Sequence, residues 1–219
     1  AGILISSPAA QAAVTWTPLA SSTTQQITGV DYRGNTIAYV TSGGQIFTGP
    51  AGGPFTKMID APGTFFTSVA LNPSGTRGTA VARGNDNGEL YVYDGAAWAK
   101  ADLSNSSVLS EGLSQNCAEP PVPRGAGPVE NVEFSGIAWA SDTVGYAVGL
   151  QEAYDPHAHS QYALKTSDGG ATWTDMQNRP DGSCLTDPDL ALWSVHTTPG
   201  LVWLAGDHNN GSALMMSNN

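Results

Sequence analysis

Short apolar runs separated by polar turns repeat four times along the chain. Each repeat opens with a large apolar residue, then Thr, Ser or Trp, then a small residue, then Val or Ile. These openings start at Ile27, Phe66, Phe134 and Leu192. Two further apolar runs follow in every repeat, and a fourth run carries an aromatic residue at Phe55, Trp98 and Trp173. Runs of this length and composition, bounded by Gly, Pro, Asn and Ser, predict β-strands.

No window of a dozen residues shows a 3.6-residue period, so we expect almost no helix. Each repeat then predicts a four-stranded antiparallel meander, which buries both faces only when repeats stack around an axis. We therefore predict an all-β fold, a β-propeller with about four blades visible. After a flexible segment or signal remnant at residues 1–13, the propeller domain covers 14–219. The expected blades are residues 27–60, 66–103, 133–178 and 192–219, the last together with 14–19.

One turn of the third repeat carries a recognisable motif. Residues 166–173 read Thr-Ser-Asp-Gly-Gly-Ala-Thr-Trp, which matches the Asp-box pattern [S/T]-x-D-x-G-x-T-W. The chain thus resembles the Asp-box (BNR-repeat) β-propellers, which include sialidases, sortilin-like receptors and photosystem II assembly factors. Degraded copies at residues 48–55 and 93–98 support the resemblance. It implies a structural turn formed by Thr166, Asp168, Gly170, Thr172 and Trp173.

The physical chemistry of such a turn explains why we expect it to be structural. A carboxylate in a tight turn accepts hydrogen bonds from nearby backbone N–H groups. Asp168 would tie the hairpin, Gly170 would supply a permissive backbone, and Trp173 would pack between neighbouring sheets.

The two ends of the chain look complementary. Residues 213–219 align with 163–169, so the last repeat stops midway through a box-like turn, and Val14–Thr17 aligns with Ala171–Thr174. One interpretation is a closed four-bladed ring in which the N-terminal strand completes the last blade. The other is a fragment of a larger propeller. The complementary ends favour closure, whereas the family resemblance favours a fragment, because Asp-box propellers generally have more than four blades.

Composition and charge exclude several classes of protein. The 219 residues include 26 Gly and 14 Pro, and only 12% are charged, which excludes a coiled coil, a helical bundle and charge-driven disorder. The net charge of −11 argues against nucleic acid and anionic membranes as partners. Since no run of about 18 apolar residues occurs, we expect no membrane insertion.

The N-terminus and the cysteines suggest export. Residues 1–13 start apolar and contain Ala10-Gln-Ala12, which is typical of a signal peptide end, although an ordinary flexible terminus also fits. Cys117 and Cys184 lie in Pro/Gly-rich loops. A disulfide between them would contribute roughly 4 kcal/mol by closing a loop of about 68 residues; two unpaired thiols in a cytosolic protein are the alternative. We expect a secreted, cell-surface or periplasmic protein.

Three long insertions set the expected place of function. Residues 104–132, 150–161 and 177–190 connect strands at the same face of a meander, opposite the Asp-box turn. Long loops on a rigid scaffold are commonly functional. The candidate ligand-binding residues on this face are Glu152, Tyr154, Asp155, His157, His159, Asp207, His208 and Arg124.

The candidate chemistry on this face is not specific. His157 and His159 would point to one side of an extended segment, which is the beginning of a metal site, but a polar exposed loop explains them more simply. We therefore expect no metal and no other cofactor. Asn85–Gly88 lacks the rest of a calcium loop and predicts a hairpin turn.

An enzyme of the sialidase type would need three clustered arginines and an Arg-Ile-Pro motif. The chain has five arginines and no such motif, and Arg33 and Arg77 fall in turns opposite the insertions. We therefore predict a non-enzymatic module that binds a protein or a glycan through the loops of blades 2–4. The alternative is a glycoside hydrolase that uses loop carboxylates. Those carboxylates are Glu119, Glu130, Glu152, Asp155, Asp187 and Asp189.

Overall fold

The computed structural model describes residues 17–83, 88–103, 132–152, 159–176, 190–208 and 211–218. All regular elements in these ranges are strands, grouped in four antiparallel sheets. A helix able to cross a membrane is not found in this part of the chain. The all-β prediction is confirmed.

The four sheets follow one another along the chain, and we call them blades 1 to 4. Blade 1 contains β1 (Ile27–Arg33), β2 (Thr36–Thr41), β3 (Gln45–Pro50) and β4 (Thr56–Asp60). Blade 2 contains β5 (Phe65–Leu71), β6 (Gly78–Arg83), β7 (Gly88–Tyr93) and β8 (Trp98–Lys100). Blade 3 contains β9 (Val132–Trp139), β10 (Gly145–Glu152), β11 (His159–Thr166) and β12 (Thr174–Asp175). Blade 4 contains β13 (Leu190–Thr198), β14 (Leu201–His208) and β15 (Gly211–Asn218).

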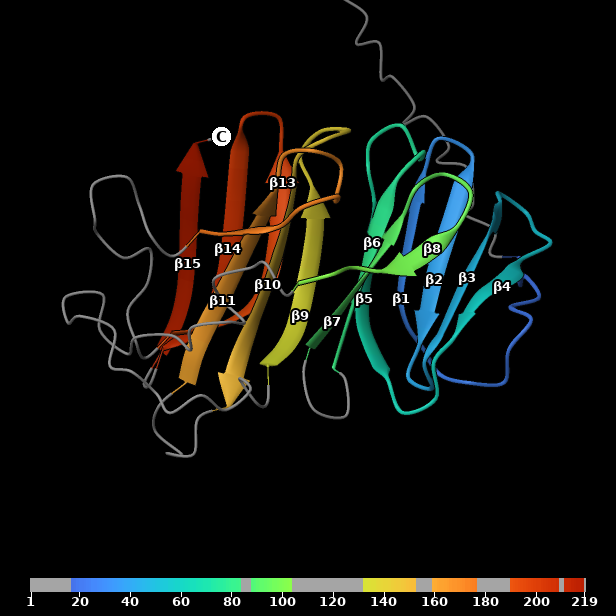
Figure 1. Cartoon of the computed structure of the whole chain (residues 1–219), viewed down its shortest axis with the longest axis horizontal. Coiled ribbons are helices and arrows are strands. Elements are labelled where there is room, and N and C mark those ends of the chain that lie inside the picture. Colours follow the sequence, from blue (N-terminus) through green and yellow to red (C-terminus); the bar gives the residue numbers. More distant parts are fainter. Residues whose placement is uncertain are drawn as a thin grey trace, which may run out of the picture.

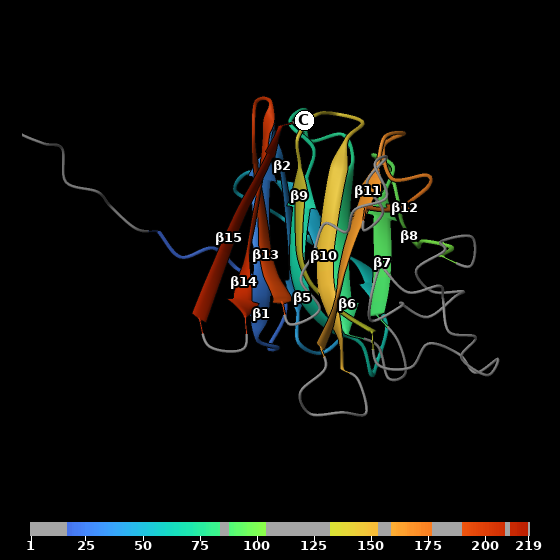
Figure 2. The same cartoon turned by 90° about the vertical axis from the view of Figure 1, so that its left-hand side faces the viewer.

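The blades stand side by side in an open row, with blade 1 and blade 4 at its opposite ends (Figure 1). The first strand of each blade packs against the first strand of the next, so β1 lies against β5, β5 against β9, and β9 against β13. We call these four the inner strands. Figure 2 views the row from the end at which blade 4 lies. This arrangement of meander sheets is that of β-propeller blades.

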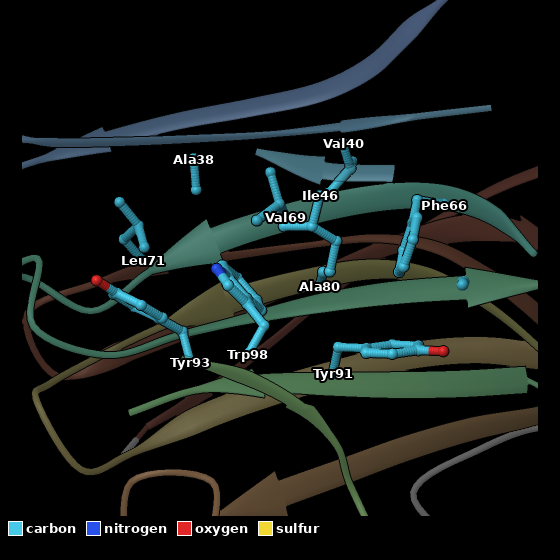
Figure 3. Packing of buried hydrophobic residues seen from close by; sticks show 11 residues of the cluster. Ala38, Val40, Ile46, Phe66, Val69, Leu71, Ala80, Tyr91, Tyr93 and Trp98 are labelled. Atoms are coloured by element: carbon cyan, nitrogen blue, oxygen red, sulfur yellow. The ribbon is translucent and has the colours of Figure 1, made fainter. Parts of the chain in front are cut away.

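Apolar side chains fill the space between consecutive blades. Between blades 1 and 2, Ala38, Val40 and Ile46 point toward the strands that carry Phe66 and Trp98 (Figure 3). Successive side chains of a strand point to opposite faces of its sheet. Blades 2 and 3 therefore each pack one set of apolar side chains against the preceding blade and another set against the following blade. Equivalent clusters form between blades 2 and 3 and between blades 3 and 4. The large apolar residues that open repeats 2 to 4 are fully buried there: Phe66, Phe134 and Leu192.

A hydroxyl group links each of the first three blades to the next. The Oγ1 of Thr28 donates to the carbonyl oxygen of Phe66 at 2.7 Å, and Thr67 donates to Phe134 at the same distance. The Ser135 hydroxyl donates to the carbonyl oxygen of Leu192 at 2.8 Å. We call these groups latch hydroxyls. They explain why Thr or Ser follows the opening residue of the repeat.

The small residue that comes next in the repeat permits the inner strands to approach closely. A Cβ on Gly29 would lie 3.2 Å from the Cα of Ser68, and one on Gly136 would lie 3.2 Å from the backbone nitrogen of Val195. Both distances are tighter than an ordinary van der Waals contact, so a larger side chain would push neighbouring blades apart.

Blade 4 differs from the other three. Trp193 stands where they have Thr or Ser, and the described residues give this blade three strands rather than four. Residues 17–26 form no strand, and residues 14–16 lie outside the described part. Completion of the last blade by residues 14–19 therefore stays a prediction.

Candidate functional site

The long connections all join strand ends at one edge of the blades, which we call the loop-bearing edge. In the antiparallel order of the blades, β8, β10 and β12 end at this edge and β9, β11 and β13 begin there. The connecting residues 104–131, 153–158 and 177–189 lie outside the described residues. Arg33 and Arg77 lie at the opposite edge, where β1 ends and β6 is about to begin. The strand order therefore agrees with the predicted placement of the insertions on one face. The second insertion is shorter than the predicted 150–161, because residues 150–152 belong to β10 and residues 159–161 to β11.

Two of the predicted ligand-binding residues meet at this edge. Glu152 is the last residue of β10, His159 is the first of β11, and the strand register pairs them directly. Directly paired residues of antiparallel strands have their Cα atoms about 4.5–5.5 Å apart. Tyr154, Asp155 and His157 lie outside the described residues, as does Arg124.

Asp207 and His208 end β14 at the same edge, next to the start of β13. The register pairs Asp207 with Ala191 and His208 with Leu190. The exposed carboxylate of Asp207 accepts a hydrogen bond of 2.9 Å from the indole Nε1 of Trp193, whose side chain is 45% exposed. Asp207 is thus already bonded to an aromatic side chain on the outer face of blade 4.

Trp193 was not among the residues predicted to form a site. The repeat pattern grouped it with Thr and Ser, although it is the one bulky residue at the latch position. The sequence signal for Trp193 was its place in the repeat, where the other three blades have Thr or Ser. An indole is too large to take the place of such a hydroxyl, so it has to find another hydrogen-bond acceptor.

The turn between β11 and β12 is built around the carboxylate of Asp168. Its Oδ1 accepts from the Thr166 hydroxyl at 2.8 Å and from the Thr172 backbone N–H at 2.9 Å, and its Oδ2 accepts from the Thr172 hydroxyl at 2.6 Å. The Thr166 hydroxyl in turn accepts from the backbone N–H of Gly170 at 2.8 Å. Burial raises the pKa of Asp168, but hydrogen bonds from Thr172, Thr166 and Ala171 outweigh it and lower the pKa to about 2.

Two other residues of the motif fit the turn to its surroundings. Gly170 has a φ of +92°, which glycine adopts without the strain a side chain would bring, and its Cα faces Val92 of blade 2. Trp173 is buried with residues of blades 2 and 3. The neighbouring Gly169 carbonyl oxygen accepts a hydrogen bond of 3.3 Å from Arg77 of blade 2. This turn thus contacts the preceding blade.

A hollow of about 370 Å³ lies along the inner strands at the edge opposite the insertions. It is lined by all four inner strands and by the turns that follow β5, β9 and β13. We call it the axial hollow. Its size is at the lower end of the range for small-molecule pockets. Sequence reasoning missed it, because a hollow between four blades depends on how the blades are spaced.

The charged groups of the hollow are partly occupied by the fold itself. The Asp31 carboxylate accepts from the Leu71 backbone N–H at 2.8 Å, which joins blades 1 and 2, and from the Tyr32 N–H at 2.8 Å. Arg33 lies 3.5 Å from the same carboxylate. His196 on β13 is exposed at the far side. Asp31 therefore serves the contact between blades, and Arg33 also donates to the carbonyl oxygen of Tyr32 at 3.1 Å.

The predicted disulfide and metal ligands fall mostly outside the described residues. Cys117, Cys184 and His157 all belong to segments that the structure does not describe, so the Cys117–Cys184 bridge stays a prediction. Among the residues it does describe, no group of three or more His, Cys, Asp or Glu side chains is arranged to hold a metal ion.

No family model and no curated protein matches the chain. Solved structures do resemble it. YCF48 from Cyanidioschyzon merolae is 13% identical with a TM-score of 0.52, over 90% of this chain and 51% of that one. The GH74 xyloglucanase from Xanthomonas campestris is 12% identical with a TM-score of 0.53, over 89% and 28%. The computationally designed Ika4 protein is 8% identical with a TM-score of 0.50, over 92% and 95%.

These similarities support the β-propeller fold. The identities are too low to carry an activity or a ligand from one protein to another. The chain spans about half the length of YCF48 and about a quarter of the xyloglucanase, so the functions of those whole proteins bear on it only as proposals.

Proposed function

We propose that this chain is a non-enzymatic binding module of the Asp-box propeller type, which binds a protein or glycan ligand at the loop-bearing edge of blades 2 to 4. One observation carries the proposal: the two longest connections, residues 101–131 between β8 and β9 and residues 176–189 between β12 and β13, both join strand ends at that edge. Binding residues are commonly found on loops that a rigid scaffold positions.

The blades supply such a scaffold. Apolar clusters fill the three blade interfaces, and the latch hydroxyls of Thr28, Thr67 and Ser135 fix the inner strands relative to one another. Strand ends held in this way keep the loops at fixed starting points, which reduces the entropy lost when a ligand binds.

The residues at the edge suit a polar and uncharged or basic partner. Glu152, His159 and Asp207 offer acceptors and an imidazole rather than a cluster of cations. With a net charge of −11, the chain repels acidic ligands. We expect a neutral glycan, or a protein surface that carries basic residues.

The proposed assignment to the Asp-box type rests on the β11–β12 turn. Both carboxylate oxygens of Asp168 accept hydrogen bonds from within the turn, and the turn lies at the edge opposite the insertions. We therefore assign Asp168 a structural role and place no ligand on it.

A glycan array, read together with hydrolysis of fluorogenic glycosides, tests the proposal. We expect specific binding to the array or to a basic protein probe, no turnover, and binding weakened at least tenfold by Glu152→Gln. Asp142→Asn is the matched control, because Asp142 lies near the opposite edge and the variant keeps the oxygen that accepts from Ser74. Turnover that Glu152→Gln abolishes would show instead a glycoside hydrolase of the sialidase-like superfamily.

We also propose that the chain is exported, to the cell surface, the periplasm or the medium, with Cys117 and Cys184 joined in a disulfide. The support comes from residues 1–13 and from the cysteine pair in the sequence. Intact-mass measurement after thiol alkylation tests the bridge: without reductant no alkyl group should be added, and after reduction two should. Two alkylated thiols without reductant would contradict it.

A further inference from the structure

Blade 2 exposes a large apolar side chain at the loop-bearing edge. Phe65 is the first residue of β5, which begins at this edge as β9 and β13 do, and it is 43% exposed. Among the described residues of blades 2 and 3, it is the one exposed large apolar side chain. Both blades have a neighbouring blade on each side within the described chain, so Phe65 does not lie at either end of the row.

The repeat does not require an aromatic residue at this position. It buries the next residue, Phe66, whose ring lies edge-on to that of Tyr91 at 5.2 Å. No such ring contact involves Phe65 among the described residues. The corresponding positions of the other three blades hold a polar or small residue: Gln26, Glu133 and Ala191. The Phe65 ring is therefore an exposed aromatic group that the core does not use.

An ion pair between blades 2 and 3 lies beside Phe65. The strand register pairs Phe65 with Arg83, the last residue of β6, so their side chains leave the same face of blade 2. The Nε of Arg83 donates to Oε2 of Glu133 on β9 at 2.9 Å. The side chains of Arg83 and Glu133 are 44% and 23% exposed. An exposed aromatic ring and an exposed guanidinium thus adjoin at the loop-bearing edge.

This combination suits a sugar ring. The face of an aromatic ring carries partial negative charge, and the C–H groups on one face of a pyranose carry partial positive charge, so the two pack together. A guanidinium has five N–H donors, and the bond to Glu133 uses the one on Nε. The terminal N–H groups of Arg83 can donate to sugar hydroxyl groups. Because Glu133 offsets the charge of Arg83, the cluster favours a neutral ligand over an ionised one.

A protein partner would need a wider apolar surface. Protein interfaces commonly bury about 800 Å² on each partner and take their binding energy from a central cluster of buried anchors. Phe65 is a single exposed ring, and the side chains beside it are charged. For this part of the edge, the observations favour a glycan over a protein.

The cluster lies close to the other candidate residues of this edge. Glu133 pairs with Leu150 on β10, and Glu152 follows two residues later along that strand, about 7 Å from Leu150. Glu152 in turn pairs with His159. A ligand that reaches from Phe65 to Glu152 extends over β5, β9 and β10, so it is an oligosaccharide rather than a single sugar.

We propose that Phe65 and Arg83 form one subsite of a binding site for a neutral oligosaccharide at the loop-bearing edge. One face of a pyranose ring stacks on Phe65, and hydroxyl groups of the same ring accept hydrogen bonds from Arg83. This inference rests on the proposed function, because it chooses the glycan as the ligand of that edge and adds two residues that contact it.

Isothermal titration calorimetry with the strongest neutral oligosaccharide found on a glycan array tests the subsite. Phe65→Leu keeps an apolar side chain but removes the aromatic face, and it should weaken binding about tenfold. Phe65→Tyr keeps that face and should retain the affinity. Arg83→Lys keeps the charge toward Glu133 but loses the planar set of donors, so it should also weaken binding. Tyr32→Leu is the matched control, because Tyr32 is 51% exposed and lies near the other end of its inner strand.

The possible results separate the subsite from the proposed function, and thermal melting checks that each variant is folded. Full affinity in Phe65→Leu, with binding lost in Glu152→Gln, would overturn the subsite and leave glycan binding at the edge in place. Equal losses in Phe65→Tyr and Phe65→Leu would overturn the stacking. Binding to a basic protein probe and to no glycan would overturn the subsite but keep the binding module. A wild type that binds neither kind of probe would overturn both.

Discussion

At the scale of single residues, Asp168 shows how a motif with a carboxylate can be structural. Its oxygens accept from two hydroxyls and a backbone N–H, all within the same turn, and the pKa near 2 reflects those bonds. A carboxylate held ionised by its own turn has little capacity left for a ligand.

Replacing Asp168 by Ala should therefore destabilise the fold and leave ligand binding unchanged. The variant loses hydrogen bonds to a charged acceptor, which costs about 1–3 kcal/mol, and we expect the melting temperature to fall by roughly 3–10 °C. Differential scanning calorimetry measures the shift, with Ser167→Ala, an exposed neighbour, as control. Weaker binding at unchanged stability would contradict the structural role.

The same residue predicts an acid limit to stability. Because the pKa of Asp168 is lower in the folded chain than its ordinary value of 3.8, its contribution is complete above about pH 4 and is lost as the pH falls toward 2. Unfolding free energies from urea titrations between pH 5 and pH 2 should fall more steeply for the wild type than for Asp168→Asn. Equal slopes for the two proteins would show that Asp168 does not contribute to this loss.

Three contacts mark how far the sequence could predict the site. The Asp168 turn follows from local spacing, since its partners lie within four residues of it. The bond between Trp193 and Asp207 joins residues 14 apart on neighbouring strands, and the pairing of Glu152 with His159 depends on register across an insertion. Such contacts need the three-dimensional structure, because a one-residue slip would reverse the faces.

At the scale of elements, the opening of each repeat is explained by the contact between inner strands. The large residue fills the interface, the hydroxyl bonds to the next blade, and the small residue permits close approach. The strand pattern and the meander order could be read from the sequence, because alternation and turn residues are local. Two features could not be read from the sequence, because both depend on how the blades are placed. They are the three-stranded form of blade 4 in the described residues and the axial hollow.

The latch predicts a specific effect of removing one hydroxyl. Thr67→Val keeps the shape of the side chain but loses bonds to the carbonyl oxygens of Phe134 and Val81, at 2.7 and 3.1 Å. We expect a loss of about 1–2 kcal/mol in unfolding free energy, measured by urea denaturation. Thr56→Val, at an exposed position of β4, is the matched control and should change stability little. Equal effects of the two substitutions would show that the latch does not join the blades.

At the scale of the whole molecule, the open row of blades separates three surfaces. The loop-bearing edge carries the insertions, the opposite edge carries the Asp168 turn and the axial hollow, and the two end faces carry exposed apolar side chains. The proposed ligand uses the first surface.

The most direct test of the account asks which edge of the blades holds the ligand. Isothermal titration calorimetry with the strongest binder found on the array or among basic protein probes would compare the wild type with Glu152→Gln and His159→Ala at the loop-bearing edge and Arg33→Ala at the axial hollow. The account predicts that the first two variants lose at least tenfold in affinity and that Arg33→Ala binds like the wild type. Full affinity in Glu152→Gln and His159→Ala, with the loss confined to Arg33→Ala, would contradict it and place the ligand in the hollow.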